Sequence, residues 1–489
     1  MIERQDTMFN TKFTLLALVA ALSGCAAVGP DFKAPEAPAG QAYRHAAQTP
    51  QAALPSAWWT VFNDTTLNAL EDRALKDSPS VQASAARLEQ ARAQLGVTRA
   101  SESPQLSVST SAAYQRSSEN TSQGILQHNT SVKGMNYQLG ASMSYEVDAF
   151  GRVRRLMESA QAQAAAAEDD HGGLLLTLSG QIASSYFQLR GLDAQAAILA
   201  LALASRQETE QLVQSRFDAG VSNELDLSRA RIETANAKSQ LTDVRRQRAD
   251  MEHALAVLVG VSPSEPLLAA GEAQLPQAPQ IPVGLPASLL AQRPDLASSV
   301  AGLRALNAQV GVAEAAFYPA ITLTGNFGYA SQPLGDLLQA GSRQFGIGPL
   351  GLSLPIFDGG RNRANLDAAK ARYAESLANH QNKLLTALRE VEDSLNDVQQ
   401  LRDQATAQDG ARTAAERAYE VARARYERGV SNYLDVTDAQ RSALSAERDT
   451  AQIATQQLLA AVAVARSLGG GWVPAVPVQS ASRASTSLR

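Results

Sequence analysis

The chain has one cysteine, Cys25, and its position suits covalent attachment of lipid. It follows "MFNTKFTLLALVAALSG", in which a lysine precedes an apolar run and two small residues stand directly before the thiol. The apolar run is too short to span a bilayer, so residues 1–24 are predicted to be an export signal, with Met1 or Met8 as the start. Small residues before a cysteine are typical of a bacterial lipobox. There the thiol takes an S-diacylglycerol group and the new amino group takes an N-acyl chain.

Two further features favour lipid at Cys25. A single cysteine in an exported protein has no intramolecular disulfide partner. Residue 26 is alanine and not aspartate, which by the lipoprotein sorting rule indicates the outer membrane. Each acyl chain would contribute about 0.8 kcal/mol per buried CH2 to anchoring the N-terminus in outer-membrane lipid. The alternative is a chance cysteine after an ordinary signal peptide.

Other residue patterns give only weak evidence for a catalytic, metal-binding or cofactor-binding site. The stretch "GIGPLG" at 346–351 has the glycine spacing of a dinucleotide site, but it leads into "LSLPIF" where such a site needs a helix. The five histidines lack ligand spacing and are expected to be solvated helix or loop residues, so no metal site is predicted. No nucleophile with a base and an orienting group can be identified, and no basic patch lacks neighbouring carboxylates. These absences disfavour an enzyme and a resident cofactor, and the net charge of -5 together with the lack of a basic patch disfavours nucleic-acid binding.

Charged and capping residues also recur in two turns, "RFDAGVSNELD" at 216–226 and "RYERGVSNYLD" at 425–435. Each glycine can take the left-handed conformation that ends a helix, and each Ser-Asn pair suits the N-cap of the next one. The aspartate of each turn then falls in the first helical turn, where a carboxylate is stabilised by about 0.3–1 kcal/mol. The predicted tip turns consist of Gly220, Val221, Ser222, Asn223 and Asp226 in the first copy, and Gly429, Val430, Ser431 and Asn432, followed by Asp435, in the second.

These turns belong to a duplicated chain. The segment "SPSVQASAARLEQARAQLGVTRASESPQLSVS" at 78–109 parallels "RPDLASSVAGLRALNAQVGVAEAAFYPAITLT" at 293–324, and prolines 79 and 294 are predicted to start a helix in each copy. The predicted organisation comprises a signal peptide (1–24), a lipid-anchored extended segment (25–62), repeat 1 (63–261), a linker (262–285), repeat 2 (286–470) and a C-terminal tail (471–489).

Each repeat contains a hairpin of alternating residues, at 105–148 and 320–357, with a bulge expected at Pro349. Both repeats then continue without proline, with helical seams such as Leu384, Val391 and Leu395, into a long pair of helices. The roughly 70 residues before each tip turn would span on the order of 100 Å as a helix. The sequence therefore predicts a mainly α protein with rods of helix and four strands.

The four strands have the length needed to cross a bilayer, with Tyr, Leu, Val, Met and Phe on one side and Ser, Thr, Asn and Gln on the other. Four strands cannot close a barrel, and open edges in lipid would leave backbone groups unpaired, so the membrane interpretation requires an oligomer. Twelve strands from three chains would enclose an aqueous lumen. The alternative is a lipid-anchored periplasmic coiled-coil scaffold or adaptor that has no pore.

Together these segments resemble the outer-membrane factor, or TolC-like, family of tripartite efflux pumps, and specifically its lipoprotein branch, which includes NodT and OprM. The resemblance also rests on "GCAAVGPDF" (24–32), "WWTVFNDTTLNAL" (58–70), "YEVDAFGRVR" (145–154) and "LGLSLPIFDGGRNRA" (350–364). It implies a homotrimer with a twelve-stranded β-barrel in the outer membrane, a periplasmic α-barrel and a belt around it that includes the linker.

The resemblance also implies function. Such a channel is a passive exit duct for small molecules, supplied by a periplasmic adaptor (membrane fusion) protein and an inner-membrane transporter, here expected to be the proton-driven resistance-nodulation-division type. The tip turns would contact the adaptor. Leu434, Asp438 and Arg441 align with the family's aperture constriction, and Asp435 is added with less weight. Ordinary helix-end ion pairs are the alternative for these charged residues.

Overall fold

A computed structural model describes residues 27–35, 43–44, 54–116, 118, 120, 133–269, 275–281 and 292–473. The predicted signal peptide, Cys25 and nearly all of the C-terminal tail lie outside these residues. The chain divides into two compact units, and both repeats contribute to each. The first unit comprises residues up to Pro35, Glu89–Ala166 and Ser299–Asn379, and the second comprises Glu36–Leu88, Ala167–Ser298 and the chain from His380 onward.

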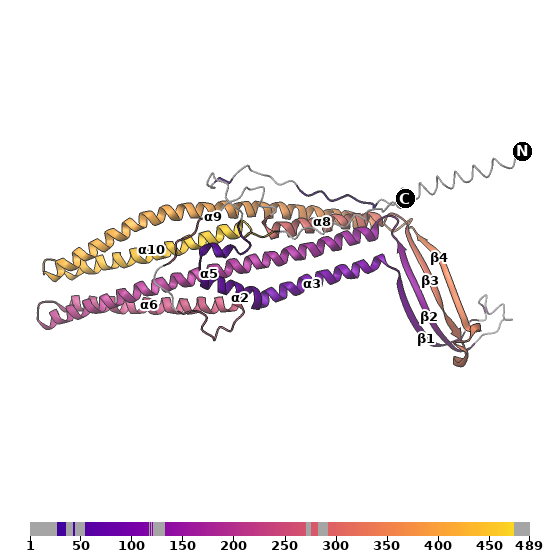
Figure 1. The fold of residues 1–489 in the computed structure, drawn as a ribbon, viewed down its shortest axis with the longest axis horizontal. Coiled ribbons are helices and arrows are strands. Elements are labelled where there is room, and N and C mark those ends of the chain that lie inside the picture. Colours follow the sequence, from indigo (N-terminus) through magenta and orange to yellow (C-terminus); the bar gives the residue numbers. More distant parts are fainter. Residues whose placement is uncertain are drawn as a thin grey trace, which may run out of the picture. The chain divides into compact units, whose positions relative to one another are not determined.

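The first unit contains one antiparallel sheet whose strands follow chain order (Figure 1). They are β1 (Gln105–Arg116), β2 (Lys133–Val147), β3 (Ala320–Ser331) and β4 (Arg343–Ser353). The pairing of β3 with β4 shifts register opposite Gly348 and Pro349, which confirms the predicted bulge. Within the described residues, β1 and β4 each have one edge without a partner strand, so the sheet alone forms no closed barrel.

The register sorts the side chains of the sheet into an apolar face and a polar face. Leu106 lies opposite Met143 on the apolar face, whereas Ser107 lies opposite Ser142 on the polar face, with their hydroxyl oxygens 2.7 Å apart. Further apolar pairs are Tyr145–Leu323, Val147–Ile321 and Phe327–Phe345, and further polar pairs are Ser144–Thr324 and Ser142–Asn326. The alternation predicted from sequence is therefore confirmed.

Helices make up most of the described chain. They are α2 (Thr65–Asp77), α3 (Pro79–Arg99), α5 (Arg152–Asp218), α6 (Glu224–Val259), α8 (Pro294–Ala315), α9 (Arg361–Glu427) and α10 (Tyr433–Ser467), with short 3-10 turns at Trp58–Phe62, Ala100–Glu102, Leu334–Asp336 and Ala340–Ser342. The repeats match closely, because α5 and α9 have 67 residues each and a proline starts both α3 and α8, as predicted.

The core of the second unit forms where α2, α5, α6 and α10 meet. Trp58 is buried in this core and donates from Nε1 to the Ser179 hydroxyl at 3.1 Å, and Ile182 of α5 is fully buried beside it. Leu384 and Val391 of α9 pack in a second cluster. His380 is buried on α9, so the expectation that every histidine is solvated is wrong; burial lowers the pKa of this imidazole.

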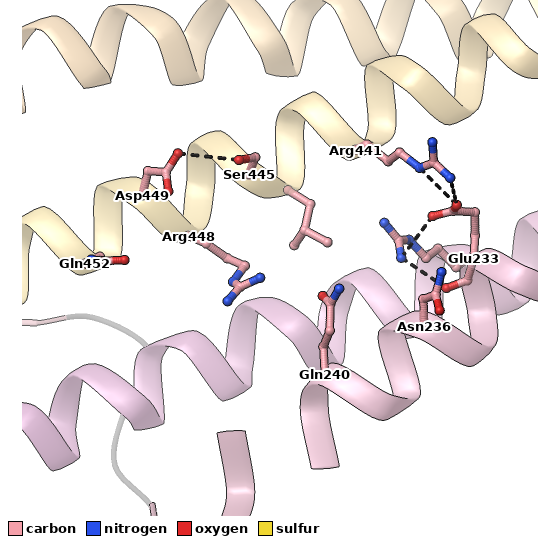
Figure 2. Close-up of a pocket in the computed structure, with 10 residues that line it drawn as sticks. Glu233, Asn236, Gln240, Arg441, Ser445, Arg448, Asp449 and Gln452 are labelled. Carbon is pink, nitrogen blue, oxygen red and sulfur yellow. Dashed lines mark hydrogen bonds and ion pairs between the residues drawn. The ribbon is translucent and has the colours of Figure 1, made fainter. Parts of the chain in front are cut away.

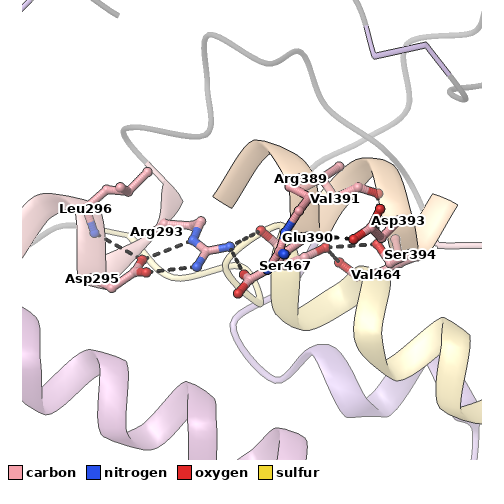
Figure 3. A network of polar contacts seen from close by, with 10 residues as sticks. All are labelled: Arg293, Asp295, Leu296, Arg389, Glu390, Val391, Asp393, Ser394, Val464 and Ser467. Carbon is pink, nitrogen blue, oxygen red and sulfur yellow. Dashed lines mark hydrogen bonds and ion pairs between the residues drawn. The ribbon is translucent and has the colours of Figure 1, made fainter. Parts of the chain in front are cut away.

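The start of α8 is held by a polar network around Arg293 (Figure 3). The Arg293 guanidinium donates to both Asp295 oxygens at 3.0 and 2.8 Å, to Glu390 on α9 at 2.8 Å, and to the Ser467 carbonyl at the end of α10 at 3.2 Å. The matching position of the first repeat is Ser78, whose buried hydroxyl has no partner among the described residues. The duplicated halves therefore differ here.

Candidate functional site

The two tip turns have the geometry that their residues predict. Gly220 and Gly429 have φ values of 74° and 76°, in the left-handed region that glycine adopts without strain. Asn223 caps α6 by accepting from the Asp226 N–H at 2.8 Å, and Asn432 caps α10 through the equivalent bond at 3.0 Å. Val221 and Val430 are exposed at the turns, and Ser222 and Ser431 are half-buried.

A contact that the sequence did not predict connects the two tips. Arg216, at the end of α5, donates to the backbone carbonyls of Tyr426 and Glu427 at 3.2 and 3.1 Å, and its guanidinium lies 4.6 Å from the Tyr426 ring centroid. Apolar packing around Tyr426 and Tyr433 surrounds this contact. The tips, which lie at one end of the helical pairs in Figure 1, are therefore joined within one chain.

The residues predicted to form an aperture gate lie on α10, in its first turns. Leu434 and Asp438 are exposed, and Asp435 lies in the first turn of the helix. Asp438 and Arg441 are one helical turn apart with 4.0 Å between their charged atoms. Arg441 makes its shorter contacts elsewhere, with Glu233 on α6.

Glu233 is the acceptor at the centre of a charged cluster (Figure 2). Its side chain is 5% exposed, and it accepts from the Arg441 Nε at 2.9 Å and lies 3.3 Å from the Arg206 guanidinium of α5. Arg206 also donates to the Glu233 carbonyl at 3.0 Å. Burial lowers the pKa of Arg206, and the hydrogen bond to Glu233 raises that of Arg441. One carboxylate thus joins α5, α6 and α10.

The cluster borders a pocket of about 370 Å³ among these three helices. Sequence reasoning missed both Arg206 and Glu233, because nothing local distinguishes them from other charged residues on long helices. A comparison of the repeats gives a partial signal, since α10 has Asp438 and Arg441 where α6 has Arg229 and Ile232.

Near the predicted lipid site, the chain that follows Cys25 is bound to the first unit by Arg155 of α5. This guanidinium, 7% exposed, donates to the carbonyls of Val28 and Gly29 at 3.1 and 3.0 Å and to Asp31 at 3.0 Å. Val28 in turn donates its N–H to the Phe150 carbonyl at 3.0 Å. These contacts connect the segment to α5 and to the bend that follows β2, and no sequence pattern distinguished Arg155 for this role.

Within the described residues, no group of three or more His, Cys, Asp or Glu side chains has a metal-binding arrangement. The glycine-rich stretch at 346–351 lies in β4 and not at a helix start, so it lacks the context of a dinucleotide site.

The model of the family "Outer membrane efflux protein" matches residues 70–261 and 285–470, one match for each repeat. The chain is 35% identical to the outer membrane protein OprJ of Pseudomonas aeruginosa, over 95% of this chain and 97% of OprJ. It is 30% identical to the cation efflux system protein CusC of Escherichia coli, over 95% of this chain and 100% of CusC. The solved structure of the outer-membrane channel OprN matches with a TM-score of 0.84 and 31% identity, over 91% of this chain and 99% of OprN. The chain therefore belongs to the outer membrane efflux protein family and is an outer-membrane channel of an efflux system.

Proposed function

We propose that three copies of this chain form the passive exit duct of a tripartite efflux pump, without catalytic activity or an energy source of its own. The observation that carries this proposal is the sheet with one polar face, one apolar face and two open edges. Three such sheets joined edge to edge would pair the backbone N–H and C=O groups of the open edges. The apolar faces would then lie in lipid, and the polar faces would enclose a lumen. A heat-modifiable trimer in outer-membrane extracts is expected; a monomer that remains soluble after Cys25→Ser would favour the pore-free scaffold.

The lipid is a separate part of the proposal. Cys25 would carry S-diacylglycerol and an N-acyl chain, and it lies two residues before the bound segment that starts at Ala27. Metabolic labelling with a radioactive fatty acid should label the wild type and leave Cys25→Ser unlabelled. Because the strands supply the main membrane contact, Cys25→Ser should still insert. Absence of label from the wild type would contradict lipidation without affecting the channel proposal.

The partners would be a periplasmic adaptor and an inner-membrane transporter of the proton-driven resistance-nodulation-division type. The turns Gly220–Asn223 and Gly429–Asn432 would contact the adaptor, and Val221 and Val430 are exposed there. Cysteines introduced at Ser222 or Ser431 should crosslink in vivo to one periplasmic protein. Ser239→Cys, an exposed site on α6 away from the turn, is the matched control; equal crosslinking there would contradict contact at the tips.

The gate would consist of Leu434, Asp435, Asp438 and Arg441, with Glu233 as the fixed partner that holds α10. The bond from Arg441 to buried Glu233 supports this role, because it ties α10 to a different helical pair. Replacing Asp438 by Asn and Arg441 by Gln together should raise single-channel conductance in planar bilayers. The matched control is Asp409→Asn with Arg412→Gln, another acid and base three residues apart, on α9. An unchanged conductance would leave Asp438 and Arg441 as ordinary helix-end ion pairs.

A further inference from the structure

The pocket beside Glu233 has more positive than negative charge. It is lined by three arginines, two acids and several neutral donors: Arg206, Arg441 and Arg448; Glu233 and Asp449; and Asn236, Gln240, Ser445 and Gln452. Glu233 already binds two of the arginines. Asp449 is exposed, and its Oδ2 lies 3.4 Å from the Ser445 hydroxyl on its own helix. Of the two acids of the pocket, only Glu233 forms ion pairs with its arginines in the described chain, so no direct contact there neutralises the charge of the third arginine, Arg448.

Two guanidinium donors in this pocket lack acceptors. The Nε atoms of Arg206 and Arg448 are both buried, and neither has a hydrogen-bond partner among the described residues. None of the ion pairs found in this part of the chain includes Arg448, whose side chain extends from α10 toward the facing helices in Figure 2. Buried donors of this kind are rarely left unpaired in proteins, because desolvation without a hydrogen bond is unfavourable.

We propose that this pocket binds a small multivalent anion that carries carboxylate or phosphate groups. Guanidinium groups bind such oxygens through paired N–H donors, and here Arg206 of α5 and Arg441 and Arg448 of α10 line one pocket. The amide groups of Asn236 and Gln240 on α6 add neutral donors. A volume of about 370 Å³ lies at the small end of the range for ligand sites, which suits a compact anion and not a large cargo molecule.

The anion would act on the channel by joining α10 to α5 and α6, next to the bond between Arg441 and Glu233. It would thus strengthen the contact that holds the gate closed. This effect rests on the proposed gate, whereas binding of the anion does not. The two can therefore be tested separately.

The binding test uses the full-length trimer in detergent, titrated calorimetrically with citrate and with inorganic phosphate. Divalent cations are removed because citrate chelates them. Sodium chloride is added so that the citrate and phosphate titrations have the same ionic strength. Arg448→Gln is the test variant, because it breaks no ion pair of the described chain and should fold. Arg246→Gln is the control, since it makes the same change on the exposed side of α6. Citrate should bind the wild type and the control equally, and Arg448→Gln at least tenfold more weakly. The site would be overturned if Arg448→Gln and Arg246→Gln bound citrate with equal affinity. It would also be overturned if the wild type bound neither citrate nor phosphate.

The channel test places citrate on the periplasmic side of trimers in planar bilayers. Citrate should lower the conductance of the wild type and of Arg246→Gln, and leave Arg448→Gln unchanged. Binding without any effect on conductance would overturn the role in closure and leave the anion site intact. If the gate variant Asp438→Asn with Arg441→Gln conducts like the wild type while citrate still binds the wild type, the proposed gate fails and the site stands.

Discussion

The Nε of Arg441 on α10 donates a 2.9 Å hydrogen bond to Oε1 of Glu233 on α6, across 208 residues of sequence. The two partners are unequal, because Arg441 is 56% exposed and Glu233 is 5% exposed. The carboxylate of Glu233 also balances the positive charge of Arg206, whose side chain is 4% exposed. The carboxylate is therefore structurally required at the centre of the cluster, while the exposed arginine can be released into water.

This difference in exposure predicts that replacing Glu233 and replacing Arg441 reduce the free energy of unfolding by different amounts. Glu233→Gln leaves Arg206 as an uncompensated buried charge and should reduce the free energy of unfolding by about 3 kcal/mol or more. Arg441→Gln removes an exposed partner and should cost about 1 kcal/mol or less. Urea denaturation of the solubilised protein measures both values, with Arg417→Gln on the exposed face of α9 as the control. Equal losses for Glu233→Gln and Arg441→Gln would contradict a buried carboxylate that serves two arginines.

The tip turns and the sheet could be predicted from sequence because their determinants are local. Gly220 needs a positive φ, Asn223 caps the next helix three residues later, and alternating residues set the faces of a strand. Duplication strengthened these predictions, since each pattern occurs twice. Local rules and the repeat together account for the observed strands and the turns.

The charged contacts could not be predicted in the same way. Arg206, Glu233 and Arg155 lie on helices with many other charged residues, and their burial depends on how distant segments pack. His380 illustrates the same limit, since a histidine among polar residues was expected in solvent and lies buried on α9. The proposed gate residues follow from the resemblance and from the difference between the repeats, whereas the contact of Arg441 with Glu233 is visible only in the structure.

The bound N-terminal segment gives a prediction for protease sensitivity. Arg155→Gln removes the donors to Val28, Gly29 and Asp31, so residues 27–35 should detach and trypsin should cut after exposed Lys33 about tenfold faster. Mass spectrometry of the released N-terminal fragment measures the rate. Arg304→Gln, a nearby exposed arginine 3.9 Å from Glu158, should leave the rate unchanged. Equal rates in the wild type and Arg155→Gln would show that other contacts hold the segment.

Buried Glu71 on α2 predicts a pH-dependent stability. Its side chain is 0% exposed, and neither carboxyl oxygen has a partner in the described chain. Burial raises the pKa of this carboxyl from 4.5 to about 9. Because the folded pKa exceeds the unfolded one, its contribution is most favourable below pH 4.5 and is lost as the pH rises toward about 9.

Glu71→Gln removes this titration, so its thermal midpoint should exceed that of the wild type by a margin that grows from pH 5 to pH 9. Glu71→Met removes both unpaired oxygens and should be more stable than the wild type at each pH. Asp72→Asn, at an exposed neighbouring carboxylate, should change the pH dependence only slightly. A margin for Glu71→Gln that stays constant with pH would mean that Glu71 is ionised in the folded protein.

Adjacent residues on β1 should respond oppositely to the same substitution. Val108 lies on the apolar face opposite Ala141, and Ser109 lies on the polar face opposite Gly140. Val108→Arg would place a charge in lipid at a cost of about 2 kcal/mol per chain, so less heat-modifiable trimer should reach the outer membrane. Ser109→Arg would place three charges in the lumen, so the trimer should assemble normally and conduct less, with a shift toward anions. Comparing trimer yield and conductance of the two variants checks the orientation of the sheet, and normal assembly of Val108→Arg with loss of trimer for Ser109→Arg would reverse it.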